Sequence, residues 1–551
     1  MKVVTLLLAL LVSVPVLAQS PALQITMTPL FSDGQLTAVS IEQHYSGLQG
    51  KQPLWSVSQT VGPLQNIAAR IHGLSLRDSQ GNVPLLDTQQ TPVVLEVSNP
   101  QSWQTGRAIN GEVTLRYTAD VSEDTNTGPT WELRSQATGV SGAGIAFLVL
   151  PDLDTDLKVT SNWVLSAFPY PASQIDSLPA APAISLNRVL MSYFMAGNLA
   201  TTPASAAPFY AASLQSFNAI SNTELLNWSA ASYKQLNRLF NTAGQQPFTV
   251  LFRDNPLIMQ SGTALPDALM VAAKAENTQS KLKQILMHEM VHVFLHGLAD
   301  ESWFQEGLAI YYQDRAAFLL GMLTVTEYAE RMNNTLLKYY SNVQKHMTMS
   351  DATAAFWTDA RARLQPYNRG AMYFMITDGR IRTATNGKRN LDHVLNQFLT
   401  MHRRGESVTK DDWLTLLQSI IGEQAYADYN AMQQGDMLIP DNNALGECFA
   451  LTKTTTPVFE LGFDIASLMQ SPRIIRGLKA GSPAAKAGLK EHDVVLNTLS
   501  LDARQATPQA PIQLVVQRGN AEQTISFVPA GPQTTSYAWQ VRGHNEEQSC
   551  H

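Results

Sequence analysis

The segment with the most recognisable chemistry is His288-Glu289-Met290-Val291-His292. Two histidines four residues apart lie one turn above one another on the same face of an α-helix. Their imidazoles can therefore bind one zinc ion together, as in the H-E-x-x-H pattern. Glu289 lies next to that face, where its carboxylate can reach a zinc-activated water without binding the metal. The segment predicts a zinc site with a general base beside it.

A carboxylate that can complete the site follows after a short gap. Glu306 opens a second predicted helix, within the stretch from Trp303 to Ala309. Three protein ligands leave one tetrahedral position for water, which is typical of catalytic rather than structural zinc. His296 continues the histidine spacing, but a straight helix rises about 12 Å from His288 to His296, too far for one ion. The predicted ligands are therefore His288, His292 and Glu306.

The alternative is a helix whose histidines are only hydrogen-bonded or exposed. The neighbouring residues argue against it, because most are apolar and indicate a largely buried helix. They are Ile285, Leu286, Met290, Val291, Val293, Phe294 and Leu295. Two histidines and a glutamate on a buried helix have a large desolvation cost unless a metal or hydrogen-bonding partners offset it. The context favours the zinc site.

The elements that must position these residues precede and follow them closely. The pattern predicts a helical stretch over Phe209–Phe240, a strand over Phe248–Phe252 and a second apolar run over Ala268–Ala273. Further helices are expected after the site, over Leu391–Met401, Lys410–Ile421 and Glu423–Met432. Residues 181–445 are therefore predicted to form one mainly helical catalytic domain.

The first part of the chain has the pattern of a β domain. Residues 19–180 hold short runs rich in β-branched and aromatic residues, which Gly, Pro, Asp and Asn separate. The expected strands are Leu23–Met27, Thr37–Ile41, Val93–Val97, Glu112–Tyr117, Ile145–Leu150 and Trp163–Ala167. These runs contain no acidic pair, histidine cluster or glycine-rich phosphate loop. We expect a β-sandwich-like domain without chemistry of its own.

Residues 446–551 have the pattern of a PDZ-like β domain with a C-terminal tail. Leu461-Gly462-Phe463 resembles a PDZ carboxylate-binding loop, and Gly481–Leu489 followed by Asp493-Val494-Val495 resembles the helix and turn of the same domain class. Strands are expected over Arg473–Arg476, Ile512–Gln517 and Gln523–Val528. Such a domain docks the C-terminal strand of a peptide by β-augmentation. The alternative is a structural lid or dimer surface with a blocked groove.

The N-terminal residues predict export. Lys2, the apolar run Val3–Leu11 and the small-residue end Val16-Leu17-Ala18 have the features of a secretory signal peptide over residues 1–18. This run is too short for a membrane anchor, and no other stretch approaches a membrane span. We expect a secreted or periplasmic protein with no membrane insertion after signal cleavage. The net charge of −7 and the lack of a basic run predict no nucleic-acid partner.

The two cysteines, Cys448 and Cys550, flank the predicted C-terminal domain. In an oxidising compartment an even number of cysteines permits a disulfide. The positions predict one bond that clasps this segment, and two free thiols are the alternative.

Together these stretches resemble the gluzincin metallopeptidases, in which two histidines on one helix and a glutamate on the next bind zinc. Within that group the chain looks like a PDZ-bearing glycyl aminopeptidase, a relative of aminopeptidase N. The matching stretches are His288-Glu289-x-x-His292, Trp303-x-x-Glu306-Gly307-x-Ala309-x-Tyr311, Pro366–Ala371, Asp378, Arg380–Arg382, Thr385–Lys388 with Leu391-Asp392, and the PDZ-like segment. The order of β domain, thermolysin-like catalytic domain and PDZ-like domain also matches.

The resemblance implies an activity and residue roles. It implies a zinc metallopeptidase with one Zn²⁺ per chain that hydrolyses peptides or proteins, in an aminopeptidase-like way. Glu289 would be general base and then general acid, and Tyr367 would hydrogen-bond the tetrahedral oxyanion. Arg369 would steady a substrate carboxylate or pair with an acid.

The chain departs from that family in two places. The gap between His292 and Glu306 is shorter. Where aminopeptidases have a glycine closely followed by a glutamate that binds the free α-amine, this chain reads Gly262-Thr263-Ala264-Leu265-Pro266-Asp267, with Asp267 further along as a substitute. A zinc endopeptidase of envelope protein quality control and a catalytically inactive PDZ scaffold are therefore the alternatives to an aminopeptidase.

Overall fold

The computed structural model of the chain has two compact units. It describes residues 21–550 apart from 63, 123–129, 203–207, 243–246, 255–259, 296, 300, 407, 506 and 543–549. The predicted signal peptide and His296 lie outside the described residues. The first unit extends to Leu199 and the second begins at Ala200, with residues 125–130 assigned to the second. No helix in the described ranges is both long and apolar enough to cross a membrane.

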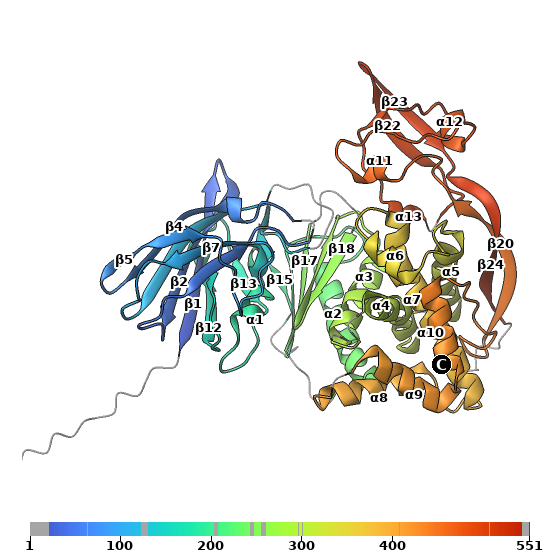
Figure 1. The fold of residues 1–551 in the computed structure, drawn as a ribbon, viewed down its shortest axis with the longest axis horizontal. Helices are drawn as coiled ribbons and strands as arrows, with labels where there is room; N and C mark the ends of the chain where they lie inside the picture. Colours follow the sequence, from blue (N-terminus) through green and yellow to red (C-terminus); the bar gives the residue numbers. More distant parts are fainter. Residues whose placement is uncertain are drawn as a thin grey trace, which may run out of the picture. The chain divides into compact units, whose positions relative to one another are not determined.

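The first unit is a β domain (Figure 1). Its sheets have the strand orders β12-β1-β2-β8-β4-β5, β13-β14-β10-β9 and β11-β3-β7-β6. The elements are β1 Ala22–Ser32, β2 Gln35–Ser46, β3 Leu54–Ser58, β4 Ile71–Asp78, β5 Gly81–Val83, β6 Leu85–Thr88, β7 Pro100–Thr105, β8 Val113–Asp120, β9 Arg134–Gln136, β10 Gly139–Ala143, β11 Leu150–Pro151, β12 Lys158–Trp163, β13 Ser173–Asp176, α1 Leu186–Leu190 and β14 Tyr193–Gly197. Alternate residues of β1 (Leu23, Ile25 and Met27) are buried, as period-two patterning predicts. The unit continues past residue 180 because β14 pairs with β10 and β13.

Some predicted strands of this unit were wrong. Val93–Val97 is irregular, because the Asp152 carboxylate accepts the backbone N–H groups of Val93, Val94 and Leu95 and so replaces a strand partner. Most of Ile145–Leu150 is likewise not a strand, since a 3-10 turn occupies Gly144–Ala146. Apolar runs alone did not distinguish these buried connections from strands.

The second unit begins with a sheet of order β15-β16-β17-β19-β18. Its elements are β15 Ala200–Thr201, β16 Phe209–Ser213, α2 Asn222–Leu239, β17 Phe248–Arg253, β18 Gln260–Leu265 and β19 Ala268–Ala273. The helix predicted from Phe209 was wrong at its start, because this segment pairs in parallel with β17. β18 is an edge strand and runs antiparallel to β19, where Gly262 pairs with Val271.

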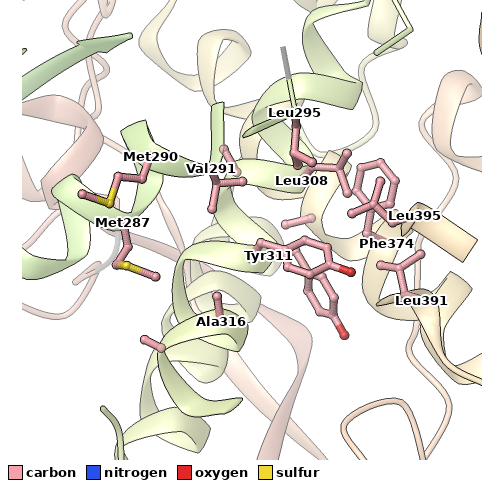
Figure 2. Close-up of a cluster of buried hydrophobic side chains, with 14 of the residues drawn as sticks. Met287, Met290, Val291, Leu295, Leu308, Tyr311, Ala316, Phe374, Leu391 and Leu395 are labelled. Atoms are coloured by element: carbon pink, nitrogen blue, oxygen red, sulfur yellow. The ribbon is translucent and has the colours of Figure 1, made fainter. Parts of the chain in front are cut away.

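Helices form the rest of the core of this unit. They are α3 Gln279–Phe294, α4 Ser302–Leu319, α5 Val325–Ser341, α6 Met349–Ala354, α7 Ala360–Ala384, α8 Leu391–Arg403, α9 Lys410–Ile421 and α10 Gln424–Gln434. Figure 2 shows how apolar side chains such as Val291, Leu308 and Phe374 form one buried cluster. The three helices that carry the predicted site, α3, α4 and α7, are thus supported by a common core.

The chain ends in a long two-stranded ribbon with a separate small body between its strands (Figure 1). The ribbon consists of β20 Phe449–Phe459 and β24 Ala530–Val541, and it packs on α5. Residues 459–530, called the C-terminal body, contain α11 Ala466–Met469, α12 Pro483–Lys486, β21 Val494–Val495, α13 Leu501–Arg504, β22 Ile512–Arg518 and β23 Ala521–Phe527. The strand predicted over Arg473–Arg476 is reduced to one bridge between Ile474 and Val494. Ala360, the first residue of α7, is buried in the apolar core of this body.

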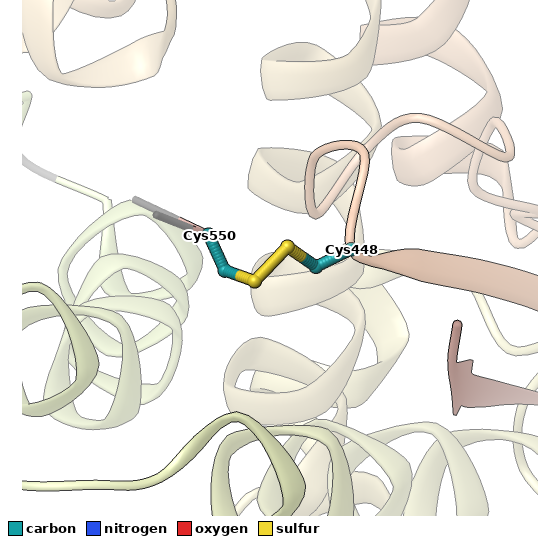
Figure 3. The surroundings of a disulfide bond; sticks show 2 residues. All are labelled: Cys448 and Cys550. Atoms are coloured by element: carbon teal, nitrogen blue, oxygen red, sulfur yellow. A yellow bond between two sulfur atoms is a disulfide. The ribbon is translucent and has the colours of Figure 1, made fainter. Parts of the chain in front are cut away.

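The predicted disulfide is confirmed (Figure 3). Cys448 and Cys550 are bonded with their Cα atoms 5.6 Å apart. Cys448 directly precedes β20, so the bond fastens the chain end beside the first residue of the ribbon.

Candidate metal centre

The first two residues of the site lie on one turn of α3. Thr278 caps this helix, and its hydroxyl oxygen accepts a hydrogen bond from the Lys281 N–H. The helix continues to Phe294, so His288 and His292 share one face. Their rings meet edge to face with centroids 4.7 Å apart. Both imidazoles therefore point to one place beside the helix.

Glu306 of α4 completes a triangle of ligand atoms with the two histidines. The Nε2 atoms of His288 and His292 are 3.2 Å apart, and one Glu306 carboxylate oxygen lies 3.2 Å from His292 and 3.4 Å from His288. Tetrahedral zinc with bonds near 2 Å separates its ligand atoms by about 3.3 Å. Among the residues that the structure describes, this is the one group of three His, Cys, Asp or Glu side chains close enough together to hold a metal ion. The donor set and its dimensions fit zinc.

Glu289 lies beside this cluster and against β18. A Cβ atom on Gly262 of that strand would lie 2.6 Å from the Glu289 carboxyl carbon, so a larger residue there would displace the Glu289 side chain. The Ala264 N–H of the same strand donates a hydrogen bond to the carboxylate. Burial raises the pKa of Glu289, and the nearby histidines oppose this only in part. The surroundings favour a carboxylate that readily takes up a proton.

His292 and Glu306 each shift the pKa of the other. Burial would lower the pKa of His292, but the Glu306 carboxylate raises it to about 9. Burial would likewise raise the pKa of Glu306, but the charges and hydrogen bonds of the two histidines lower it well below its usual range. Glu306 is therefore an anion at neutral pH, as a metal ligand must be.

Tyr367 faces the same cluster from α7. Its ring lies nearly parallel to the His288 ring, with centroids 6.4 Å apart and an interplanar angle of 16°. Its hydroxyl hydrogen-bonds the Glu306 carboxylate. Burial, followed by the charges of Glu306 and Glu289, raises the pKa of Tyr367 well above its usual value. The phenol therefore keeps its proton and is a hydrogen-bond donor beside the cluster.

Helices α4 and α7 cross at two glycines, and this crossing sets the distance between Glu306 and Tyr367. A Cβ atom on Gly307 would lie 2.6 Å from the Gly370 Cα, and one on Gly370 would lie 2.8 Å from the Gly307 Cα. The two backbones are therefore in direct contact beside the site. Sequence reasoning missed this contact, although each glycine lies within three residues of a predicted site residue.

A buried ionic network fixes the second half of α4. The Arg315 guanidinium donates hydrogen bonds of 2.6 and 2.9 Å to the Asp392 carboxylate and lies 3.5 Å from an Asp378 oxygen. The hydroxyls of Tyr311 and Tyr312 donate to Asp378 and Asp392, respectively. Asp378 is on α7 and Asp392 is on α8, so the network joins three helices. Sequence reasoning missed Arg315, because a single arginine inside a helix forms no motif.

Two residues named from the sequence lie away from the cluster. Asp267 is in the turn between β18 and β19, past the end of the strand that contacts Glu289. Arg369 is fully buried and donates hydrogen bonds to the peptide oxygens of Met347 and Lys345. Neither role expected for Arg369 is therefore correct, because its guanidinium supports the backbone.

Comparisons with known proteins show similarity at the level of the fold. No family model matches the sequence, and neither does any curated protein. The structure resembles an aminopeptidase N family protein from Idiomarina loihiensis, with a TM-score of 0.67 and 13% identity over 94% of this chain and 98% of that one. The two proteins therefore share a fold, a mixed α and β architecture with an N-terminal β domain.

Two further matches are looser. An M1 zinc metallopeptidase from Deinococcus radiodurans matches with a TM-score of 0.42 and 15% identity, over 77% of this chain and 94% of that one. Leukotriene A4 hydrolase from Saccharomyces cerevisiae matches with a TM-score of 0.44 and 12% identity, over 77% of this chain and 68% of that one. A shared fold does not by itself imply a function, which lies in the residues of the site.

Proposed function

We propose that this protein is a zinc-dependent peptidase that binds one zinc ion through His288, His292 and Glu306. The observation that carries the proposal is the triangle of ligand atoms, with sides of 3.2–3.4 Å, that two helices bring together. Three such ligands leave one tetrahedral position for water, as catalytic zinc requires. The fold shared with an aminopeptidase N family protein supports the assignment.

The residues around the ligands match the steps of peptide hydrolysis. Zinc, when bound, acidifies water and polarises the scissile carbonyl. Glu289, whose pKa is raised by burial, accepts the proton of the attacking water and then passes it to the leaving amine. Tyr367 keeps its proton and donates a hydrogen bond to the oxyanion that develops on the carbonyl oxygen. The partly buried surroundings strengthen both interactions, because they lower the local dielectric constant.

Strand β18 is the element best placed to hold the substrate. It is the edge of its sheet and contacts Glu289 through Gly262 and Ala264, and an edge strand can pair with an extended peptide. The shared fold supports aminopeptidase-like cleavage. The six residues Gln260–Leu265 include no acid that would bind a free α-amine, and this favours an endopeptidase as the second candidate.

We further propose that the C-terminal body is a PDZ-like domain and that the protein is exported. Gly462 has a left-handed φ of +81° in the expected carboxylate-binding loop, and Ser482 caps α12. Arg363 of α7 hydrogen-bonds Asp502 of α13 at 2.9 Å, which favours a structural role of this domain over peptide docking. The disulfide supports export to an oxidising compartment, such as the periplasm.

Zinc content and peptide hydrolysis test the main proposal together. The purified protein should contain one zinc per chain and cleave peptides in a mixed library. A chelator should stop this cleavage, and added zinc should restore it. His288→Ala should lose both zinc and activity. The matched control His72→Ala, at an exposed histidine of the first unit, should lose neither. Full activity of metal-free wild-type protein would refute the proposal, and a folded protein that holds zinc without cleaving any peptide would favour the inactive scaffold.

Paired peptides with free and acetylated N-termini decide between the two modes of cleavage. An aminopeptidase cleaves only the free form, from its end. An endopeptidase cleaves both forms at the same internal bond. Mass spectrometry of the products distinguishes the two patterns directly.

A further inference from the structure

A row of aromatic rings connects the proposed metal site with the protein surface. Tyr367, whose ring lies parallel to that of His288, is itself faced by Phe356 at a centroid distance of 6.5 Å and an interplanar angle of 28°. Phe356 in turn meets Trp357 edge to face at 4.9 Å. The row therefore extends from a proposed metal ligand, past the proposed oxyanion donor, to the solvent.

Trp357 is the open end of this row. Its exposed fraction is 62%, the highest of any large apolar side chain in the described part of the second unit. Phe356 is half-buried, and so is Tyr367. An exposed tryptophan on its own needs no explanation. Trp357 differs because its ring contacts lead through Phe356 and Tyr367 to the proposed metal site. Its exposed surface is therefore linked to that site by packing.

The turn that presents the two rings is held in place. It connects α6 to α7, and the N–H groups of Thr358 and Asp359 both donate hydrogen bonds to the Ala355 peptide oxygen, at 3.0 and 2.9 Å. Asp359 then caps α7. A surface that is ordered in advance loses little conformational freedom when a ligand binds. Phe356 and Trp357 are therefore arranged for contact before any ligand arrives.

The charges next to the rings are already paired. Asp359 and Arg361 form an ion pair at 2.7 Å on the α7 side of the turn. The carboxylate and the guanidinium therefore satisfy each other, and the two rings remain an uncharged, flat and apolar surface. Such a surface recognises another apolar side chain, with the best geometry for an aromatic one, because offset and edge-to-face ring pairs are favourable.

We propose that Phe356 and Trp357, together called the aromatic ledge, form a subsite for a large apolar substrate side chain close to the scissile bond, with aromatic side chains preferred. This inference rests on the proposed peptidase function and adds the substrate class. The ledge selects substrates and takes no part in bond cleavage.

Two peptides that differ only by Phe or Ala at a residue flanking the cleaved bond test the ledge. For the wild type, kcat/KM should be about tenfold higher for the Phe peptide, a ratio usual for one apolar contact. In Trp357→Ala this ratio should fall towards one, mainly through a lower kcat/KM for the Phe peptide. Trp357→Phe should retain most of the ratio. Ile439→Ala, at another exposed apolar residue of this unit, is the matched control and should change nothing.

Several results would overturn the ledge and leave the peptidase function intact. One is an unchanged Phe-to-Ala ratio in Trp357→Ala, and another is an equal loss for both peptides, which would mean a structural role. If the wild type cleaves neither peptide, the peptidase proposal fails separately. Calorimetry still tests in that case whether the aromatic ledge binds an aromatic side chain. The wild type must bind the Phe peptide about tenfold more tightly than Trp357→Ala does.

Discussion

The two glutamates of the site differ because their surroundings differ. Glu306 lies between two imidazoles that lower its pKa, whereas burial raises the pKa of Glu289. A carboxylate that stays ionised suits a metal ligand, and one that takes up protons suits a general base. Two glutamates that sense each other's charge are therefore suited to different roles.

Replacing Glu289 should separate metal binding from hydrolysis. Glu289→Gln keeps the size of the side chain in its narrow space beside Gly262 but removes the proton acceptor. We expect full zinc content and a loss of at least about 10²-fold in kcat, since general bases contribute about that much or more. Elemental analysis and steady-state kinetics on the same sample check both parts. Undiminished turnover would mean that another group is the base.

Tyr367→Phe tests the oxyanion donor. The ring contact with His288 should persist, because only the hydroxyl is removed. We expect kcat to fall by roughly 10²-fold with little change in KM or zinc content, as for other single oxyanion donors. A rise in KM alone would indicate a role in substrate binding instead.

The residues of the site were predictable to different degrees. The helix period placed His288 and His292 on one face, and the short gap made Glu306 available. Tyr367 was expected only from the family resemblance. Its position depends on where α7 crosses α4, about 60 residues further along the chain, and no local pattern encodes that crossing. The catalytic roles of all these residues stay predictions.

At the level of elements, the glycine crossing of α4 and α7 should control the site. Gly370→Ala would place a Cβ atom against the Gly307 backbone and force the helices apart. We expect a loss of about 1–3 kcal/mol of stability, the usual cost of overpacking, together with weaker zinc binding. Gly379→Ala is the matched control on the same helix, because its Cβ would meet the Ala444 Cβ and Cα at 3.2 and 3.3 Å, a milder contact than the 2.8 Å to the Gly307 Cα. Urea unfolding and zinc titration distinguish the two variants.

The network around Arg315 should be needed for the stability of α4. Arg315→Met would leave the buried Asp392 without its ion-pair partner, while Asp378 would keep Arg382, and we expect a loss of about 3–5 kcal/mol at pH 7. Burial would raise the pKa of Asp392, but the charge and hydrogen bonds of Arg315 lower it overall. The lowered pKa stabilises the wild type above about pH 4, and this stability is lost as the pH falls further. The difference between wild type and variant in urea unfolding should therefore shrink in acid.

The predicted helices and strands were correct where the apolar periodicity was strong. They were wrong where contacts with residues distant in the sequence determine the secondary structure. The helix over Lys410–Ile421 was confirmed to the residue. Phe209–Ser213 is a strand because it pairs with β17. Val93–Val97 is not a strand, because its N–H groups donate hydrogen bonds to the Asp152 carboxylate instead of to a neighbouring strand. Long-range partners of this kind are not visible in a local pattern.

In the whole molecule, the disulfide joins residues that are 102 positions apart. Removing it in a Cys448→Ser/Cys550→Ser double variant should lower stability by about 2–4 kcal/mol, because the unfolded chain gains freedom. The ribbon still pairs β20 with β24 without the bond, so activity at room temperature should remain. Thermal unfolding with and without reductant measures the effect. An unchanged Tm would show that the ribbon alone fixes the chain end.

Helix α7 begins within the apolar core of the C-terminal body and one turn later pairs Arg363 with Asp502. Four residues further on, the same helix presents the proposed oxyanion donor. The C-terminal body therefore supports α7 and is not an independent appendage. Exchanging it for a related domain would expose Ala360 and remove the support for the first turn of the helix. Truncation or domain exchange at this end of the chain should therefore disturb α7 as well.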